Sequence, residues 1–179
     1  MISFENIIID AKSGVSGAGR SEALEYNICE CSETVKAYKV STHRHTSEIE
    51  QELSIAAGRE ITLSFTPHLI PMKRGILSTC YANLNGVFTA AEIVEIYKSF
   101  YKDEYFVRVY GQGLPETKFV AGSNYIDIGI AVDKRLNRVV AVSALDNLVK
   151  GAAGQAVQNM NIMFCIDEAE GLRMPGFYV

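Results

Sequence analysis

Three neighbouring residues, His43, Arg44 and His45, carry the side chains best suited to acid-base chemistry and anion binding in this chain. They include two of the three histidines in the sequence, and imidazole is the side chain that most readily exchanges a proton near neutral pH. A guanidinium between them can hold a carboxylate or phosphate through two parallel hydrogen bonds. Two structural histidines near a helix start are the plainer alternative, and the lack of a suitably spaced third ligand argues against a metal site.

Two other segments have residues that suit an anion or a cofactor. Asp10–Arg20 contains three glycines and two serines, and such a loop can turn its backbone N–H groups toward a phosphate. Its spacing matches neither a Walker A loop nor the dinucleotide fingerprint, so a flexible turn is the alternative. Arg74 follows Pro67 and Pro71 in a stiffened loop, where it either binds an anion or is simply exposed.

The segment Asp146–Asn161 has the composition of a helix that something approaches closely. It contains Gly151 and Gly154, and each glycine inside a helix costs about 1 kcal/mol relative to alanine. Close contact with another part of the protein, or with a ligand, would compensate for this cost. The segment is therefore predicted to form one wall of a cleft.

The cysteines offer little chemistry of their own. Cys80 lies in a predicted strand, where a cysteine is more often a small buried apolar residue than a nucleophile. The four cysteines form no CxxC pair, which is typical of a protein in a reducing compartment. We expect neither a disulfide framework nor a zinc site.

A strand-to-helix junction is expected to present the His43–His45 triplet. Tyr38–Thr42 has the composition of a strand, and Ser47 with Glu50 three residues later has the spacing of a capping box. If the triplet is still extended, its two histidines share a face and the arginine points away.

The remaining pattern predicts an α+β fold in which helices cover a sheet. An apolar strand at Phe4–Ile9 opens the chain, and Thr89 with Glu92 forms a second capping-box pattern before a core helix. Alternating apolar residues predict further strands, at 61–66, 76–84, 105–110, 120–132 and 138–145.

Composition narrows the class of protein. The chain has 179 residues, of which 48% are hydrophobic, enough to bury the core of one domain. A net charge of −4 without a basic cluster argues against nucleic-acid binding. No apolar run approaches the roughly 20 residues that span a bilayer, and no signal peptide is apparent. We expect a cytoplasmic protein with no membrane partner.

Five blocks of sequence, in this order, resemble the C-terminal domain of the N-acetyl-gamma-glutamyl-phosphate reductase family: DAKSGVSGAGR, HRHTSEIEQEL, FTPHLIPMKRGIL, GSNYIDI and DNLVKGAAGQAVQNMN. The family belongs to the semialdehyde dehydrogenases, whose C-terminal domain is similar to that of glyceraldehyde-3-phosphate dehydrogenase. The resemblance implies one domain over residues 1–179 with a mixed, largely antiparallel sheet. It also implies that 146–165 is a helix packed at the cofactor cleft of an N-terminal NADP-binding Rossmann domain that is absent here.

The family reduces an acyl phosphate to an aldehyde with NADPH, in arginine biosynthesis. The resemblance implies that the nucleophilic cysteine precedes this chain, so that the chain alone is inactive, and it argues against recruiting Cys80. His45 is the favoured acid/base residue and His43 the alternative. Arg44 and Arg74 are expected to bind the carboxylate or phosphate of the small-molecule substrate.

The resemblance also implies which residues line the cofactor. Near NADP we expect Ser13, Gly14, Ser16 and Gly17, with Asn147 and Gly151 at the nicotinamide end. Two positions depart from the family pattern: Ser47 stands where proline is usual, and Ile126 where cysteine is usual.

Two classes of function remain open on the sequence. The chain is either a piece of the reductase, acting as its catalytic scaffold and subunit interface, or a free-standing binding or oligomerisation module. A related reductase of lysine biosynthesis, which acts on a carrier-linked aminoadipyl phosphate, is a further alternative. In either class a dimer or tetramer formed through the sheet is expected.

Overall fold

The computed structural model describes residues 1–18 and 24–177, and these form one seven-stranded sheet with helices at its ends and on one face. The strands follow the order β2-β3-β1-β4-β7-β6-β5. Their bounds are Ile7–Gly14 (β1), Lys36–Ala37 (β2), Leu63–Ile70 (β3), Ile76–Asn83 (β4), Val107–Val109 (β5), Ile126–Asp133 (β6) and Arg138–Leu145 (β7). The α-helices are Ile28–Cys31 (α1), His45–Ala57 (α2), Ala90–Phe100 (α3) and Gly154–Met163 (α4).

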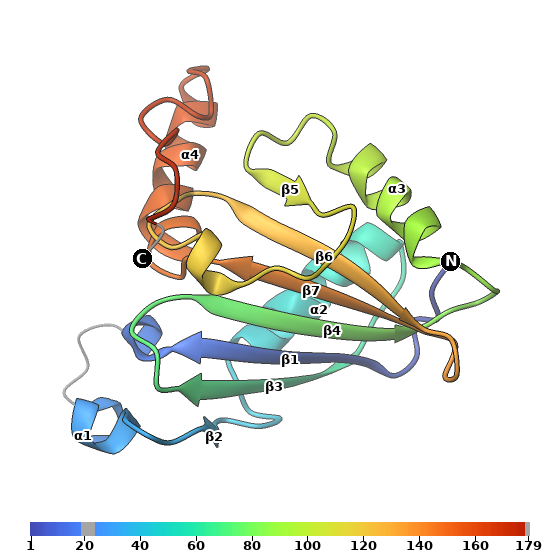
Figure 1. The fold of residues 1–179 in the computed structure, drawn as a ribbon, viewed down its shortest axis with the longest axis horizontal. Helices are drawn as coiled ribbons and strands as arrows, with labels where there is room; N and C mark the ends of the chain where they lie inside the picture. Colours follow the sequence, from blue (N-terminus) through green and yellow to red (C-terminus); the bar gives the residue numbers. More distant parts are fainter. Residues whose placement is uncertain (19–23, 178–179) are drawn as a thin grey trace.

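The predicted fold class is confirmed, since the sheet is mixed and largely antiparallel. β1 and β3 are parallel neighbours, and so are β5 and β6, while the four other pairings are antiparallel. The connection from β1 to β3 contains α2, as a parallel pair requires a long crossover. Because β1, β4 and β7 lie side by side in the centre, the ends of β1 and β7 bring their following loops close together (Figure 1).

Both long helices cover the same face of the sheet. The buried core joins Ile93 and Val94 of α3 to Ile128 and Ile130 of β6, and Leu53 of α2 packs against the same cluster. The β1, β4 and β7 side chains in this cluster are aligned by the strand register, because alternate residues of a strand share a face. In Figure 1 α2 passes behind the strands, which places the covered face away from the viewer.

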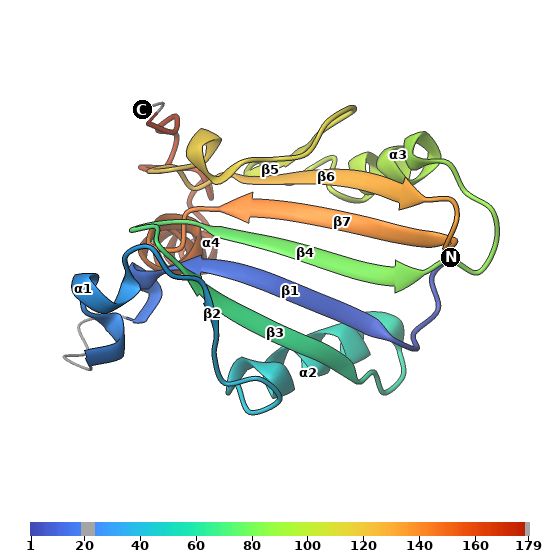
Figure 2. The ribbon, with the colours of Figure 1, turned by 60° about the horizontal axis from the view of Figure 1, so that its bottom comes forward.

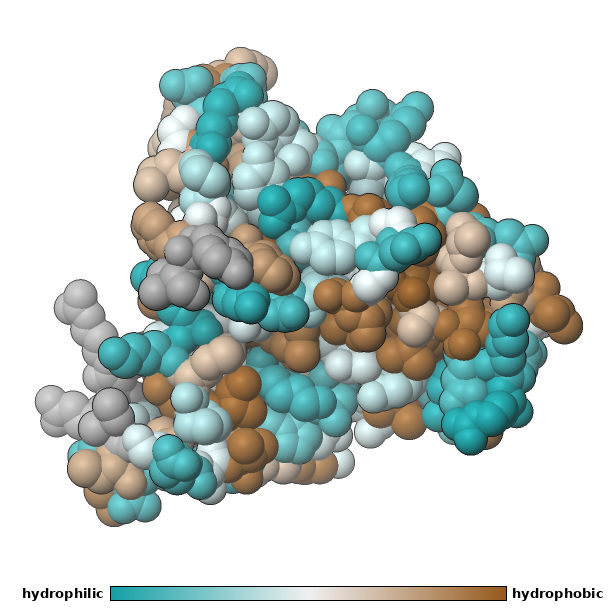
Figure 3. Space-filling view, in the orientation of Figure 1, coloured by the Kyte–Doolittle hydropathy of each residue, from teal (hydrophilic) through white to brown (hydrophobic). Residues whose placement is uncertain are grey.

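None of the α-helices of the described residues covers the opposite face of β3, β1, β4 and β7 (Figures 1 and 2). The strand register places Leu77 and Tyr81 of β4 and Val140 of β7 on this face. Figure 3, drawn from this side, shows a hydrophobic area near its centre. Part of this face is overlaid by loops. Val142 and Ala144 of β7, on the same face as Leu77, are buried, and residues 113–115 lie so close to Gly129 of β6 that a Cβ there would be 2.8 Å from the Gly113 carbonyl oxygen.

Several predicted strands differ in extent. The strand predicted at 120–132 begins only at Ile126, because a 3-10 turn and a loop precede it. The first strand runs from Ile7 to Gly14 rather than Phe4 to Ile9, because pairing on both sides continues to the end of β3 and supplies backbone partners for residues expected in a loop. The strand expected at Tyr38–Thr42 was wrong. Only Lys36–Ala37 pair with β3, since Lys39 and Ser41 have positive φ angles that break an extended backbone.

The capping box expected at Ser47 and Glu50 was also wrong. The helix begins earlier, with Arg44 as N-cap and no side-chain cap. Ser47 donates to the Arg44 carbonyl oxygen, and the Glu50 carboxylate accepts from the backbone N–H of Leu63 instead. The capping box at Thr89 is confirmed, because its hydroxyl and the Glu92 carboxylate satisfy each other's backbone N–H groups.

The segment expected as a helix from Asp146 has two parts. Residues Val149–Ala153 form a π-helix, and Gly154–Met163 continue as α4. A π-helical turn inserts an extra residue into an α-helix, and such turns are frequent at functional sites. Asp146 and Asn147 precede it, between the end of β7 and the first turn.

Candidate functional site

A cleft of about 400 Å³ opens where the ends of β1 and β7 meet the start of α2. Its walls come from segments far apart in the sequence. The lining residues are Ala11, Ser13, Gly17, Tyr26, Tyr38, Lys39, His43, Arg44, His45, Phe65, Pro67, Leu69, Ile76, Asn147 and Gly151. The structure therefore brings together seven of the ten residues predicted for the site, and places Gly14, Ser16 and Arg74 behind or beside the cleft wall.

His43 is held rigidly at the rim of this cleft. Its ring makes edge contacts with Tyr38, His45 and Phe65 at centroid distances of 5.6, 4.9 and 5.3 Å. Its Nδ1 accepts a hydrogen bond of 3.3 Å from the backbone N–H of His45. Because Nδ1 is an acceptor, the neutral imidazole carries its proton on Nε2, which is thereby the nitrogen free to act as a donor.

The charge state of His43 follows from its surroundings. Burial lowers the pKa of His43, and the nearby positive charges of His45, Lys39 and Arg44 lower it further. The imidazole is therefore kept neutral at pH values where a free histidine would be partly protonated. His45 is exposed at the first residue of α2, so its ring can meet a small molecule in the cleft.

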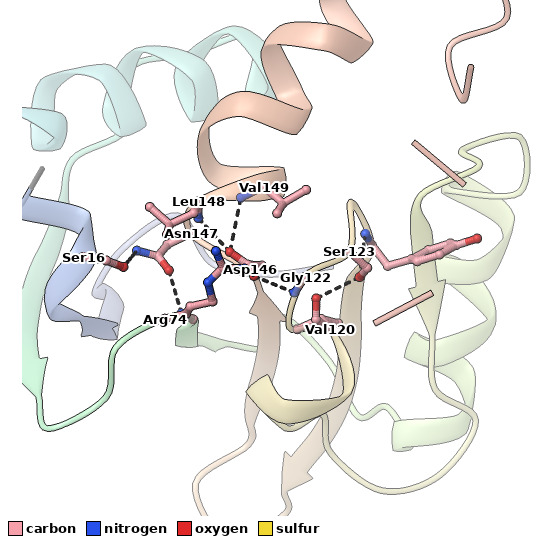
Figure 4. A network of polar contacts seen from close by, with 11 residues as sticks. Ser16, Arg74, Val120, Gly122, Ser123, Asp146, Asn147, Leu148 and Val149 are labelled. Carbon is pink, nitrogen blue, oxygen red and sulfur yellow. Dashed lines mark hydrogen bonds and ion pairs between the residues drawn. The ribbon is translucent and has the colours of Figure 1, made fainter. Parts of the chain in front are cut away.

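Asn147 ties the cleft wall to two neighbouring loops. Its Oδ1 accepts a 2.6 Å hydrogen bond from the backbone N–H of Gly75, and its Nδ2 donates to the Ser16 hydroxyl at 3.0 Å. Both bonds appear in the close-up of Figure 4. Asn147 consequently fixes the loop after β1 against the loop before β4, and Ser16 serves this contact rather than lining the cleft directly.

Asp146, beside it, is a fully buried carboxylate at 0% exposure. It accepts hydrogen bonds from the backbone N–H groups of Gly122, Leu148 and Val149, and it pairs with Arg74 at 3.1 Å (Figure 4). A buried charge requires such compensation. The Arg74 guanidinium is thus oriented toward Asp146. Substrate could bind only to the part of the guanidinium that remains exposed, and this role of Arg74 stays a prediction.

The glycines of the site differ in the space that surrounds them, and so in the reason why a larger residue is absent. A Cβ on Gly14 would lie 2.9 Å from the Arg74 backbone nitrogen, and one on Gly154 would lie 2.4 Å from Asn124 Oδ1. Both are required by packing within the chain. A Cβ on Gly151 would meet nothing nearer than 3.5 Å, so internal packing does not explain this glycine on the cleft wall.

Cys80 lacks the surroundings of a nucleophile. It lies in mid-strand with its Sγ 3.7 Å from the Ser78 hydroxyl, and burial raises the pKa of its thiol. A thiolate is the reactive form, so this environment disfavours reactivity. Among the described residues no group of three or more histidine, cysteine, aspartate or glutamate side chains is placed to hold a metal ion.

Three polar residues of the cleft, Tyr26, Tyr38 and Lys39, belong to no sequence pattern that would have selected them. Tyr38 was assigned to a strand, so its place in a turn facing His43 was missed. Lys39 has a φ of 46°, a conformation that brings a cation beside the histidine triplet. Asp146 was inside a selected segment, but its burial depends on contacts with distant loops that no local pattern reveals.

The sheet and cleft define the fold of semialdehyde dehydrogenases. Aspartate semialdehyde dehydrogenase II from Vibrio cholerae matches with a TM-score of 0.69 at 14% identity, covering 92% of this chain and 56% of that chain. A probable aspartate-semialdehyde dehydrogenase from Pseudomonas aeruginosa also gives 0.69, at 15% identity over 89% of this chain and 55% of its own. At these identities the likeness concerns the fold.

Residues 1–147 match the family model of the semialdehyde dehydrogenase dimerisation domain, and the chain belongs to that family. Among its relatives, N-acetyl-gamma-glutamyl-phosphate reductase of Acetivibrio thermocellus is 66% identical over 180 residues, covering 100% of this chain. The protein of the same name from Caldicellulosiruptor bescii is 57% identical over 178 residues and 99% of this chain. The chain spans 52% of the length of each.

No described helix combines the length and apolar character needed to cross a membrane.

Proposed function

We propose that this chain is the C-terminal domain of a cytoplasmic, NADPH-dependent reductase that converts N-acetyl-glutamyl phosphate to the semialdehyde and phosphate. The observation that carries the proposal is the cleft, in which the histidine triplet, the serine-glycine loop after β1 and the glycine of the π-helix face one another. The names of relatives at 66% and 57% identity supply the reaction and substrate. We place the nucleophilic cysteine in the part of the complete enzyme that this chain does not span.

The residues at one side of the cleft fit a nicotinamide cofactor. Gly151 has free space where a side chain would stand, and Gly17 is exposed with Ser13 Oγ only 3.2 Å from the position of a Cβ. These positions would let the planar end of NADP approach the backbone closely. When bound, NADPH supplies the hydride.

The other side of the cleft fits an anionic substrate. Arg44 and Lys39 provide positive charge near the neutral His43, and a guanidinium can bind a carboxylate or phosphate in bidentate fashion. In the complete enzyme a cysteine thiolate from outside this chain would attack the acyl carbon and displace phosphate, and NADPH, when bound, would supply the hydride that releases the aldehyde and the thiolate. We assign proton transfer to His45, and hydrogen bonding to the developing oxyanion to the Nε2–H of His43.

The uncovered face of the sheet supports pairing of two copies. The family is a dimerisation domain, and this face combines Leu77, Tyr81 and Val140 with the ion pair of Lys12 and Asp10. Apolar surface of this kind marks protein interfaces. We assign the homo-oligomer contact to the exposed side of β3, β1, β4 and β7.

The end of α4 supports contact with the nucleotide-binding domain. Met160, Met163 and Phe164 are 47%, 79% and 71% exposed, although they are large and apolar. They lie on the helix that continues from the cleft wall (Figure 1). We therefore propose that residues 146–165 pack against the Rossmann domain of the complete enzyme.

A hybrid enzyme tests the proposed function. The chain is joined to the part of the Acetivibrio thermocellus relative that it does not span, and NADPH oxidation is followed with N-acetyl-glutamyl phosphate. We expect turnover by the hybrid and none by either piece alone. A folded hybrid that binds NADPH but does not oxidise it with this substrate contradicts the proposal.

A further inference from the structure

An apolar patch of the sheet forms the floor of the cleft. Its residues come from three neighbouring strands, β1, β3 and β4, and are Ala11, Phe65, Pro67, Leu69 and Ile76. Because alternate residues of a strand share a face, they extend the same side of the sheet that carries the buried core. The edge contact of Phe65 with His43, at 5.3 Å, places this floor directly beside the histidine triplet.

Ala11 has the smallest side chain of this floor and lies near its centre. The strand register sets it between Pro67 of β3 and Ser78 of β4, and sets Leu69 and Ile76 in the next row. Ala11 is only 8% exposed, yet it still lines the cleft. A larger side chain at this position would therefore fill space that a bound molecule could use.

The charged residues that line the cleft are all basic. Its described lining residues include Lys39, Arg44 and two histidines but no aspartate or glutamate. Neither Lys39 nor Arg44 takes part in an ion pair with another described residue. The cleft consequently offers no carboxylate to an ammonium group, and its two cations would repel one.

We infer that the floor around Ala11 is a subsite for the uncharged N-acyl group of the substrate, and that the basic residues beside it exclude a free amine. Under the proposed function, on which this assignment rests, the substrate is an N-acylated amino-acid phosphate. A free α-amino group is protonated at neutral pH, whereas an N-acetyl group is uncharged and ends in a methyl group that gains free energy on an apolar surface. Ala11 then decides how large an acyl group the cleft accepts.

A series of N-acyl substrates measures the size of this subsite in the hybrid enzyme. The reverse reaction is followed with NADP and phosphate, using N-formyl, N-acetyl and N-propionyl glutamate semialdehyde. Ala11→Val should lower the ratio of kcat/KM for the acetyl substrate over the formyl substrate by at least about 10-fold, because one methylene in an apolar pocket is worth about 10- to 200-fold. Ile76→Ala should raise the ratio for the propionyl over the acetyl substrate by at least about 5-fold, for the same reason.

Ala82→Val is the matched control for Ala11→Val. Ala82 lies on the same face of the sheet and is also 8% exposed, but it belongs to the core and does not line the cleft. It should leave both acyl ratios unchanged, even where thermal unfolding shows a loss of stability. Equal ratios in the two variants of an active hybrid overturn the inference while the proposed function stands, whereas a folded hybrid without turnover of the N-acetyl substrate overturns both. If Ala11→Val fails to fold, the Ile76→Ala ratio decides.

Inhibition of the hybrid tests whether the basic residues exclude the amine. N-acetyl-glutamate should inhibit at least about 50-fold more strongly than glutamate, since only glutamate brings an ammonium group beside two cations. Lys39→Glu should narrow this difference at least about 5-fold by supplying a carboxylate, and Lys134→Glu, the same charge change on the exposed turn 134–137, should not. Equal inhibition by the two compounds, or an unchanged difference in Lys39→Glu, overturns the exclusion of the amine.

Discussion

At the scale of single residues, the site depends on polar groups whose partners are distant in sequence. The histidine triplet and the two serines could be selected from the chain, because their residue types carry the chemistry. The orientation of the His43 ring by Tyr38 and Phe65 could not be predicted from the sequence, because the local pattern indicated a strand where Tyr38 follows one. Likewise, the pairing of Arg74 with Asp146 spans 72 residues.

The two histidines of the triplet are expected to differ in importance. In the hybrid enzyme, His45→Ala should lower kcat by at least about 100-fold, the usual range for loss of a general acid or base. Steady-state NADPH oxidation measures the effect, with His68→Ala as a control on β3 outside the cleft. Full activity of the His45→Ala enzyme removes this residue from proton transfer.

The titration of His43 has a predicted sign. Its pKa is lowered in the folded chain, so the unfolded chain binds more protons as pH falls through the ordinary histidine pKa near 6.5. Its contribution to stability is therefore complete above that value and is lost below it. Histidine NMR titration should give His43 a pKa below about 6.5, and the loss of stability on acidification should be smaller in His43→Gln. A pKa above 6.5 contradicts the description of its surroundings.

At the scale of elements, the junction of β7, the π-helix and α4 forms one wall of the cleft, through Asn147 and Gly151. Asn124 and Lys150 both donate to the Gln158 Oε1 of α4, at 3.0 and 2.7 Å, so the helix is fixed to the loop before β6. The sequence predicted a helix in this segment, as α4 confirms. Its π-helical first turn could not be predicted, because it arises from the hydrogen bonds of Asp146 with the first N–H groups.

The two glycines of this junction should respond differently to alanine. Gly154→Ala should lower the free energy of unfolding by about 1–3 kcal/mol, because its Cβ would overlap Asn124 Oδ1 and crowd Val149. Gly151→Ala, where the Cβ has room, should stay within about 1 kcal/mol of wild type and instead weaken NADPH binding in the hybrid. Urea unfolding measures the first and fluorescence titration the second. Equal destabilisation by both substitutions counts against this distinction.

At the scale of the whole molecule, alternation of apolar residues predicted most strands and thus the fold class. This alternation could not predict the strand order or register, because both depend on which strands pair across long separations in the sequence. The parallel β1–β3 pair, for example, is closed by a crossover of 48 residues between Gly14 and Leu63. The uncovered face of the sheet is a property of this arrangement, not of any one strand.

Pairing through that face can be tested with a single substitution. The chain should form dimers, and Leu77→Asp should give monomers because it places a charge in a desolvated interface. Sedimentation equilibrium distinguishes the two species, and thermal unfolding checks that the variant is folded. Dimers that persist in the folded Leu77→Asp variant would show that the contact lies elsewhere.

We propose that this cleft completes a reductase for N-acetyl-glutamyl phosphate, on a fold shared with aspartate semialdehyde dehydrogenases. The most direct measurement is kcat/KM of the hybrid enzyme for this substrate and for aspartyl phosphate, under identical conditions. We predict a preference of at least about 100-fold for N-acetyl-glutamyl phosphate, equivalent to about 2.7 kcal/mol of differential transition-state binding. An equal or reversed preference would contradict the account.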